Sequence, residues 1–280
     1  MRKQILIVLS MISAVALITF TGCKKEKEEV DNDTSAASEN AMADAAFTDV
    51  ANIADEASTG SLTSYRTSSN ERVLTSCATI TIDTVTVPHT ITIDFGSSNC
   101  LGNDGNYRRG IILVSYSGNY RDSGSTHTIS FNNYFVNDNQ ILGTKTVTNN
   151  GRNASGNLSF SIAVNGSIVW DASFGGGTST HVATRMREWV AGENTQIRID
   201  DVYLISGSAS GVTRTGKSYT MNTLTPCRKR IGFRHFTEGI IEFTPSGKPT
   251  RTVDYGYING AEDNLAMVTI NGNSFAITLR

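Results

Sequence analysis

In Ile91-Thr92-Ile93-Asp94-Phe95, large apolar residues alternate with polar ones, and this alternation indicates the fold class. Successive side chains of a β-strand point to opposite faces, so this period of two predicts a strand with one buried face and one wetted face. The same alternation recurs in Ile80–Ile82, Ile112–Tyr116, Phe160–Val164 and Phe275–Leu279. We therefore expect an all-β domain of antiparallel strands.

Turn signals separate these apolar runs. Asn-Gly and Asp-Gly pairs readily adopt the positive φ angles that tight hairpins need. Such pairs occur at Asp104-Gly105, Asn150-Gly151, Asn165-Gly166, Asn259-Gly260 and Asn271-Gly272, and a further loop is expected at Ser206–Gly211. No long helical pattern alternates with the strands, so consecutive strands should lie side by side in a large antiparallel meander. A twisted open sheet, a sandwich and a half-closed barrel all fit this pattern.

The N-terminus has the pattern of a secretory signal. Arg2 and Lys3 precede an almost wholly apolar run over residues 5–20, slightly short for a membrane span of about 20 residues. The run ends in Thr21-Gly22-Cys23, which resembles a lipobox, the small-residue motif before an acylated cysteine. The resemblance implies that Cys23 becomes the mature N-terminus and carries palmitate with other acyl chains, which together anchor a protein stably. A plain signal peptide with a chance cysteine is the alternative.

A charged segment follows the cysteine over residues 24–33, and its lack of apolar periodicity predicts a solvated tether. The segment resembles the surface-export signal of Bacteroidota lipoproteins, although an ordinary linker has the same composition. Lys24 stands where the inner-membrane retention signal has aspartate. We therefore expect a lipid anchor in the bacterial outer membrane, in either leaflet, the cell surface included.

One short helix should precede the sheet, over residues 41–57. Apolar residues recur there at helical spacing, with acidic residues elsewhere on the helix. The apolar positions are Phe47, Val50, Ile53 or Ala54, and Ala57, and the acidic ones are Asp44, Asp49, Asp55 and Glu56. The chain then divides into a lipoprotein signal peptide over 1–22, a flexible charged tether over 23–40, the short helix with a loop over 41–70, and a single β-rich domain over 71–280.

Composition and spacing exclude several kinds of chemistry. The net charge of −2, without clustered Lys and Arg, argues against a nucleic-acid partner. The four histidines lack the spacing of a metal clip, and no GxSxG nucleophile elbow is present. Asp200 and Asp201 would point to opposite faces of a strand, so they should not act as a catalytic pair. We therefore predict no catalytic residue, no metal and no cofactor.

The cysteines other than Cys23 suggest one covalent link. Cys77 and Cys100 stand at the far ends of two runs that should fold back on each other, so a disulfide between them is plausible in an oxidising compartment. Cys227 is then left without a partner cysteine. We expect it to be a buried, inert thiol.

Two further places carry candidate sites. A strand over Thr184–Trp189 would place Arg185, Arg187 and Trp189 on one face, with Trp170 on the preceding strand. Such a patch could stack on sugars or hold anionic groups, or the Trp could close the core edge with the Arg stems lying along it. Separately, Thr84 lies in Asp83-Thr84-Val85, which resembles the acceptor motif for O-glycosylation in Bacteroidota.

Five stretches of residues 75–280 resemble a family of Bacteroidota outer-membrane and surface lipoproteins of uncharacterised function. They are Ile91–Gly96, Cys100–Gly105, Gly143–Asn149, Arg187–Trp189 and Asp254–Gly256. The family has another cysteine near the position of Glu262-Asp263-Asn264, where this chain has none. The resemblance implies a fold and a location but no reaction.

The function expected from these features is a membrane-anchored, non-enzymatic binding or structural module, whose partner is a glycan or an envelope protein. Two alternatives fit the sequence as well. One is a glycan-acting hydrolase whose acids converge only in the fold, and the other is a carrier of lipid or lipopolysaccharide with an apolar groove.

Overall fold

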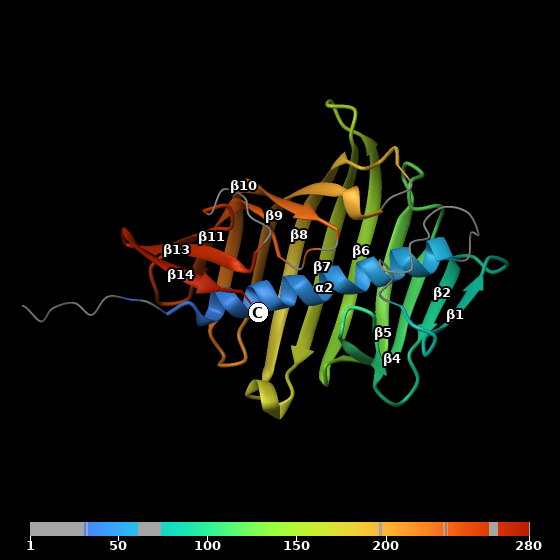
Figure 1. The fold of residues 1–280 in the computed structure, drawn as a ribbon, viewed down its shortest axis with the longest axis horizontal. Helices are drawn as coiled ribbons and strands as arrows, with labels where there is room; N and C mark the ends of the chain where they lie inside the picture. Colours follow the sequence, from blue (N-terminus) through green and yellow to red (C-terminus); the bar gives the residue numbers. More distant parts are fainter. Residues whose placement is uncertain are drawn as a thin grey trace, which may run out of the picture. The chain divides into compact units, whose positions relative to one another are not determined.

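In a computed structural model, the described part of the chain forms an antiparallel sheet of fourteen strands, and a helix lies across one face of the sheet (Figure 1). The structure describes residues 31, 33–60, 74–195, 198–231, 233, 235–257 and 263–279. The signal peptide, Cys23 and half of the expected tether lie outside these residues. The predicted all-β class and antiparallel meander are confirmed. Of the three arrangements that fit the sequence, the open sheet is the one found, with β1 and β14 as its edges.

The strands lie in the sheet almost in chain order. The path runs β1-β2-β4 and onward to β14, and β3 pairs with β4 beside it. The strands are β1 Thr79–Asp83, β2 His89–Asp94, β3 Cys100–Leu101, β4 Tyr107–Tyr116, β5 Thr126–Val136, β6 Asn139–Arg152, β7 Leu158–Val169, β8 Thr178–Ala191, β9 Val202–Val212, β10 Ser218–Arg230, β11 Glu238–Pro245, β12 Arg251–Asp254, β13 Leu265–Ile270 and β14 Asn273–Thr278. Two 3-10 turns, η1 Ala172–Phe174 and η2 Arg198–Asp200, lie between strands.

The helix α2, Ser35–Gly60, is longer than the sequence predicts. It begins six residues before residue 41, inside the expected tether of residues 23–40, so that part of the prediction is wrong. The Asp33 carboxylate accepts a hydrogen bond from the backbone N–H of Ser35 at 3.0 Å, which satisfies a donor at the helix start. Glu39 and Asn40 are buried in this first part of the helix. Contacts with the sheet therefore stabilise a polar segment that shows no apolar periodicity of its own.

The core lies between α2 and the sheet face toward it, which we call the inner face. Phe47, Val50, Ile53 and Ala57 of α2 are each 1% exposed or less, as their spacing predicts. They belong to one apolar cluster with inner-face residues such as Ile129. Helix and sheet form a single compact unit over Asp33–Arg280. We call the opposite sheet face, which points away from α2, the outer face.

Three of the predicted turns are strand residues instead. Asn150-Gly151 lies within β6, Asn165-Gly166 lies within β7, and Ser206–Gly211 lies within β9. Gly166 serves close packing, because a Cβ there would overlap the ring of Phe47 on α2. Asn271-Gly272 does form a tight turn, between β13 and β14, with φ angles of 48° and 80°. Asn259-Gly260 lies outside the described residues.

Candidate functional site

The inner face carries basic side chains that pair with acids of α2. Arg108 on β4 has a fully buried side chain, and its Nη2 lies 2.7 Å from Asp49 on the helix and 2.6 Å from Asp104 in the preceding turn. Burial acts to lower the pKa of Arg108, but the hydrogen bond to Asp104 and the charge of Asp49 raise it above its ordinary value. The guanidinium therefore stays charged and ties the helix to β4.

A second pairing lies near the middle of the helix. Asp44 accepts hydrogen bonds of 2.9 and 3.0 Å from Arg185 on β8, and Nε2 of His181 lies 3.2 Å from Asp44 Oδ1. Burial acts to raise the pKa of Asp44, but Arg185 and then His181 hold it below its ordinary range. The Nδ1 atom of His181 lies 3.1 Å from the Tyr219 hydroxyl.

Lys145 on β6 is buried between these pairs. Its Nζ donates a hydrogen bond of 2.8 Å to the backbone carbonyl of Phe47. Burial lowers the pKa of Lys145 to about 8, opposed by the charge of Asp44. Among the described residues, no carboxylate accepts a hydrogen bond from this amine, and its contact with the helix is through the Phe47 carbonyl.

The N-terminal part of α2 forms two more acid–base pairs of this kind. Glu39 lies 3.0 Å from Arg214 in the turn after β9, and Asp33, just before the helix, lies 2.8 Å from Lys248 after β11. From Asp33 to Asp49 the acids thus meet bases from successive parts of the sheet, from the β11–β12 side across to β4. We call Asp33, Glu39, Asp44 and Asp49 the acid ladder.

The sequence predicts that the helix acids lie off the apolar stripe, but it does not predict the acid ladder, because it gives these acids no partners. A signal was present: Asp44 and Asp49 are five residues apart, a net rotation of about 140° on a helix of 3.6 residues per turn. They therefore lie on opposite borders of the apolar stripe, where each can reach the sheet. The sequence carries no sign of which bases they meet.

The predicted patch is only partly assembled. Arg185, Arg187 and Trp189 occupy alternate inner-face positions of β8, and the guanidinium of Arg187 lies 4.8 Å from the ring centre of Tyr203, which in turn contacts Trp189. Arg185 and Trp189 are buried. The guanidinium of Arg185 is paired with Asp44 and therefore faces α2.

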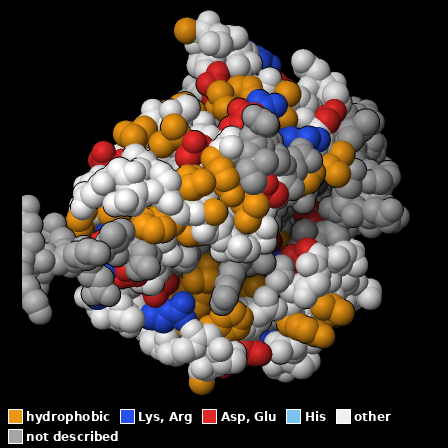
Figure 2. All heavy atoms as spheres, turned by 60° about the vertical axis from the view of Figure 1, so that its left-hand side comes forward, with side chains coloured by type: hydrophobic (Ala, Val, Ile, Leu, Met, Phe, Trp, Pro, Cys, Tyr) orange, Lys and Arg blue, Asp and Glu red, His pale blue; other side chains and the backbone are white. Residues whose placement is uncertain are grey.

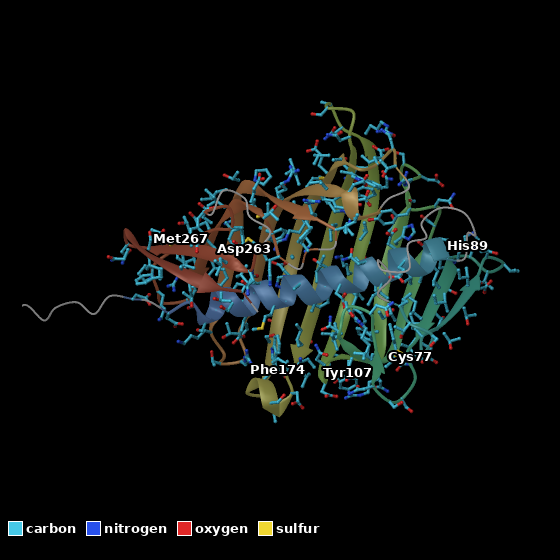
Figure 3. All side chains as sticks on the ribbon, viewed as in Figure 1. Cys77, His89, Tyr107, Phe174, Asp263 and Met267 are labelled. Atoms are coloured by element: carbon cyan, nitrogen blue, oxygen red, sulfur yellow. A yellow bond between two sulfur atoms is a disulfide. The ribbon has the colours of Figure 1, made fainter. Side chains whose placement is uncertain are left out.

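Trp170 belongs to a different place. Its Nε1 donates to Ser179 Oγ at 2.8 Å, near the start of β8. Trp189 is at the far end of that strand, roughly 30 Å away at about 3.3 Å per residue. The ring of Trp170 also lies 6.4 Å, in a tilted arrangement, from that of Phe174, which Figure 3 shows in the loop that joins β7 to β8.

Aromatic and guanidinium side chains form a continuous band of contacts at the other end of β8. Arg187 lies over the rings of Phe160, Tyr203 and Tyr120, at 4.7 to 5.6 Å from their centres. Tyr120 in turn contacts His127. The neighbouring pairs continue the band to Tyr116, His89, Trp189 and Arg121. These cation–π and aromatic contacts join β2, β4, β5, β7, β8 and β9 at one end of the sheet.

A small cavity of about 10 Å³ adjoins the Asp44–Arg185 pair. It has room for about one water molecule and not for an organic ligand. Cys227, which lines it, is 2% exposed, and burial raises the pKa of its thiol to about 12. The thiol is therefore protonated and unreactive at neutral pH.

Two candidate modification sites lie around β1. Cys77 and Cys100 form a disulfide, with their Cα atoms 5.9 Å apart. Thr84 is exposed in the loop between β1 and β2. The preceding Asp83 carboxylate accepts hydrogen bonds from the backbone N–H groups of Val85 and Thr86, at 2.8 and 3.2 Å, which orders this loop.

Asp200 and Asp201 do not lie on opposite faces of a strand, so that expectation is wrong. Asp200 ends the 3-10 turn η2, and Asp201 precedes β9. A Cβ on Gly192 would lie 2.7 Å from Asp200 Oδ1 and 2.5 Å from Asp201 Oδ1, so both carboxyl groups approach one point. Asp201 is 1% exposed, and Asp200 accepts a hydrogen bond from Thr195.

Within the described residues, no three His, Cys, Asp or Glu side chains are grouped to hold a metal ion. None of the helices in this same part of the chain is long and apolar enough to cross a membrane. No protein family, curated protein or solved structure matches this chain.

Proposed function

We propose that this chain is a lipid-anchored outer-membrane lipoprotein of the Bacteroidota type, which acts as a non-enzymatic binding or structural module of the cell envelope. The anchor rests on the signal-like run over residues 5–20 and on Cys23 at its end. The membrane, through the lipid, is its first partner, and an envelope glycan or protein is its second.

The main support for a binding or structural role is that α2 fills the inner face of the sheet. Phe47, Val50 and Ile53 occupy the apolar centre of that face, and the acid ladder neutralises bases around it. Among the described residues, the cavity beside Asp44 holds about one water and is too small for the lipid that a carrier would hold. On the side drawn in Figure 2, hydrophobic side chains gather in several areas, one of them a hollow below the centre of the view, with charged side chains between these areas. A sheet whose inner face is filled by its own helix suits binding at the surface better than transport.

Metabolic labelling with an alkyne analogue of palmitate tests the anchor. The wild-type chain should take up the label and fractionate with outer membranes, whereas a Cys23→Ala variant should do neither. Equal labelling of the two chains, or none of either, contradicts the anchor. Protease treatment of intact cells then separates the outer leaflet from the inner one, because only a surface-exposed chain is cleaved.

In-cell chemical crosslinking tests the module. The anchored chain should form a discrete adduct with an envelope component, and the Cys23→Ala chain should lose it. A chain that is anchored but forms no adduct contradicts the binding role and leaves the anchor standing.

Intact-mass measurement tests Thr84 as an O-glycan acceptor. The wild-type chain should carry a sugar mass that a Thr84→Ala variant lacks. A wild-type mass without sugar rejects this modification.

A further inference from the structure

The outer face of the sheet is lined by small hydroxyl-bearing residues. Because Lys145 points toward α2, its neighbours Thr144 and Thr146 point the other way, and the strand registers extend each into a row. The row through Thr146 is Asp83, Thr90, Ser115, Thr128, Thr146, Ala163, Thr184, Ser208, Asn222, Glu242, Thr252, Thr269 and Ser274. The row through Thr144 is Thr81, Thr92, Leu113, Ser130, Thr144, Asn165, Val182, Ser210, Thr220 and Thr244. No residue of either row is buried.

The two faces have the reverse of the usual charge distribution. The wetted face of an antiparallel sheet ordinarily carries the charged side chains, and Lys and Arg are rarely buried. Here Arg108, Lys145 and Arg185 are buried on the inner face, whereas the only charged members of the outer rows are Asp83 and Glu242. The preference of strands for Thr explains why Thr is frequent in these rows. It does not explain why Lys, Arg and Glu are scarce there, although such residues normally keep exposed sheets soluble.

The chemistry of these rows suits a neutral, hydroxyl-bearing partner. Each Ser or Thr hydroxyl donates one hydrogen bond and accepts others. Neighbouring strands repeat about every 4.8 Å, and residues two apart on one strand about every 6.7 Å, so the hydroxyl groups form a lattice. Exposed apolar atoms of Val182 and Met186 lie among them. A saccharide surface has the same mixture of hydroxyl groups and C–H faces.

We infer that the outer face binds a neutral, hydroxyl-rich glycan. The inference deepens the proposed binding module and rests on it. An anionic polymer would meet no Lys or Arg in these rows, and a lipid would meet no continuous apolar surface. When a neutral glycan binds, no charged group has to lose its hydration water on most of the face. The Ser and Thr hydroxyl groups can therefore replace water with sugar hydroxyl groups at a small cost in free energy.

Affinity electrophoresis tests the inference. The acylated full chain, purified from envelopes in neutral detergent, is run through gels that contain dextran or mannan as neutral polysaccharides, or alginate as an anionic one. The outer-face variant is Thr144→Glu with Thr184→Lys, which leaves the net charge unchanged. The control variant is Ser155→Glu with Ser246→Lys, which makes the same changes in exposed turns. Thermal melts show that each variant is folded.

We expect dextran or mannan, but not alginate, to retard the wild-type chain. The outer-face variant should bind roughly tenfold or more weakly, equivalent to about 1.4 kcal/mol, and the control should bind like the wild type. Retardation by neither neutral polysaccharide, or equal retardation of the two variants, overturns the inference. So does a wild-type dimer that the outer-face variant abolishes, because the face would then serve a second copy. If crosslinked adducts with an envelope protein persist meanwhile, the module stands and only its glycan specificity fails.

Discussion

The carboxylate of Asp44 accepts two hydrogen bonds from the guanidinium of Arg185, which lies 141 residues further along the chain. The side chain of Arg185 is 9% exposed and that of Asp44 is 21% exposed. A charged pair removed from water in this way contributes little net stability over an apolar pair, but it is costly to break on one side. It therefore fixes where α2 lies on the sheet.

Removing one side of this pair should be strongly destabilising. We expect Asp44→Asn to lower the free energy of unfolding by about 3 kcal/mol, because Arg185 keeps a buried charge without its carboxylate. Urea denaturation measures the change. The matched control is Asp138→Asn, at a half-exposed carboxylate paired with Arg109, which should cost less than about 1 kcal/mol. Equal costs for the two variants would contradict a fixing role for Asp44.

Gly166 and Phe47 should be energetically coupled. Gly166→Ala places a methyl group where the ring of Phe47 lies, so we expect a loss of about 1 to 3 kcal/mol. In a Phe47→Leu background the same substitution should cost less, because the smaller side chain leaves space. A double-mutant cycle by urea denaturation measures this coupling. Strictly additive effects would show that the helix does not pack against Gly166 in solution.

Lys145 should make stability depend on pH in the alkaline range. Its pKa is lowered from 10.5 to about 8 by burial, so above pH 8 the unfolded chain binds more protons at this amine than the folded chain does. The contribution of this group to stability therefore rises from about pH 8 to about pH 10.5. Cys227, whose pKa is raised to about 12 by burial, acts in the opposite direction above pH 9.

A Lys145→Met variant isolates the effect of the lysine. It should be at least as stable as the wild type at pH 7, because an apolar side chain replaces a buried amine. The free energy of unfolding of the wild type should then increase relative to that of the variant as the pH rises from 8 to 10. Urea midpoints at several pH values measure the difference. A constant difference across this range means that Lys145 is not buried as described.

The disulfide should stabilise the β1–β4 end of the sheet. Cys77 and Cys100 close a loop with a sequence separation of 23, so its loss should cost about 3 kcal/mol through the entropy of the unfolded chain. In urea denaturation, the Cys77→Ser, Cys100→Ser variant and the reduced wild type should show similar decreases in the free energy of unfolding. Reduction should leave the double variant unchanged, and a further loss there would point to an effect elsewhere.

Patterns local in the chain are enough to predict the antiparallel strand class and the apolar stripe of α2. These depend on the period of two or 3.6 between residues close in the chain, and Ile91–Phe95 or Phe47–Ala57 display it without reference to anything distant. Tertiary structure alone decided that α2 extends back to Ser35, that Gly166 is a packing position rather than a turn, and that Asp44 meets Arg185. Each of these features depends on residues brought together from distant parts of the chain. The effect of a buried charge, or of a glycine that lacks a Cβ, depends on which group packs against it in the folded protein.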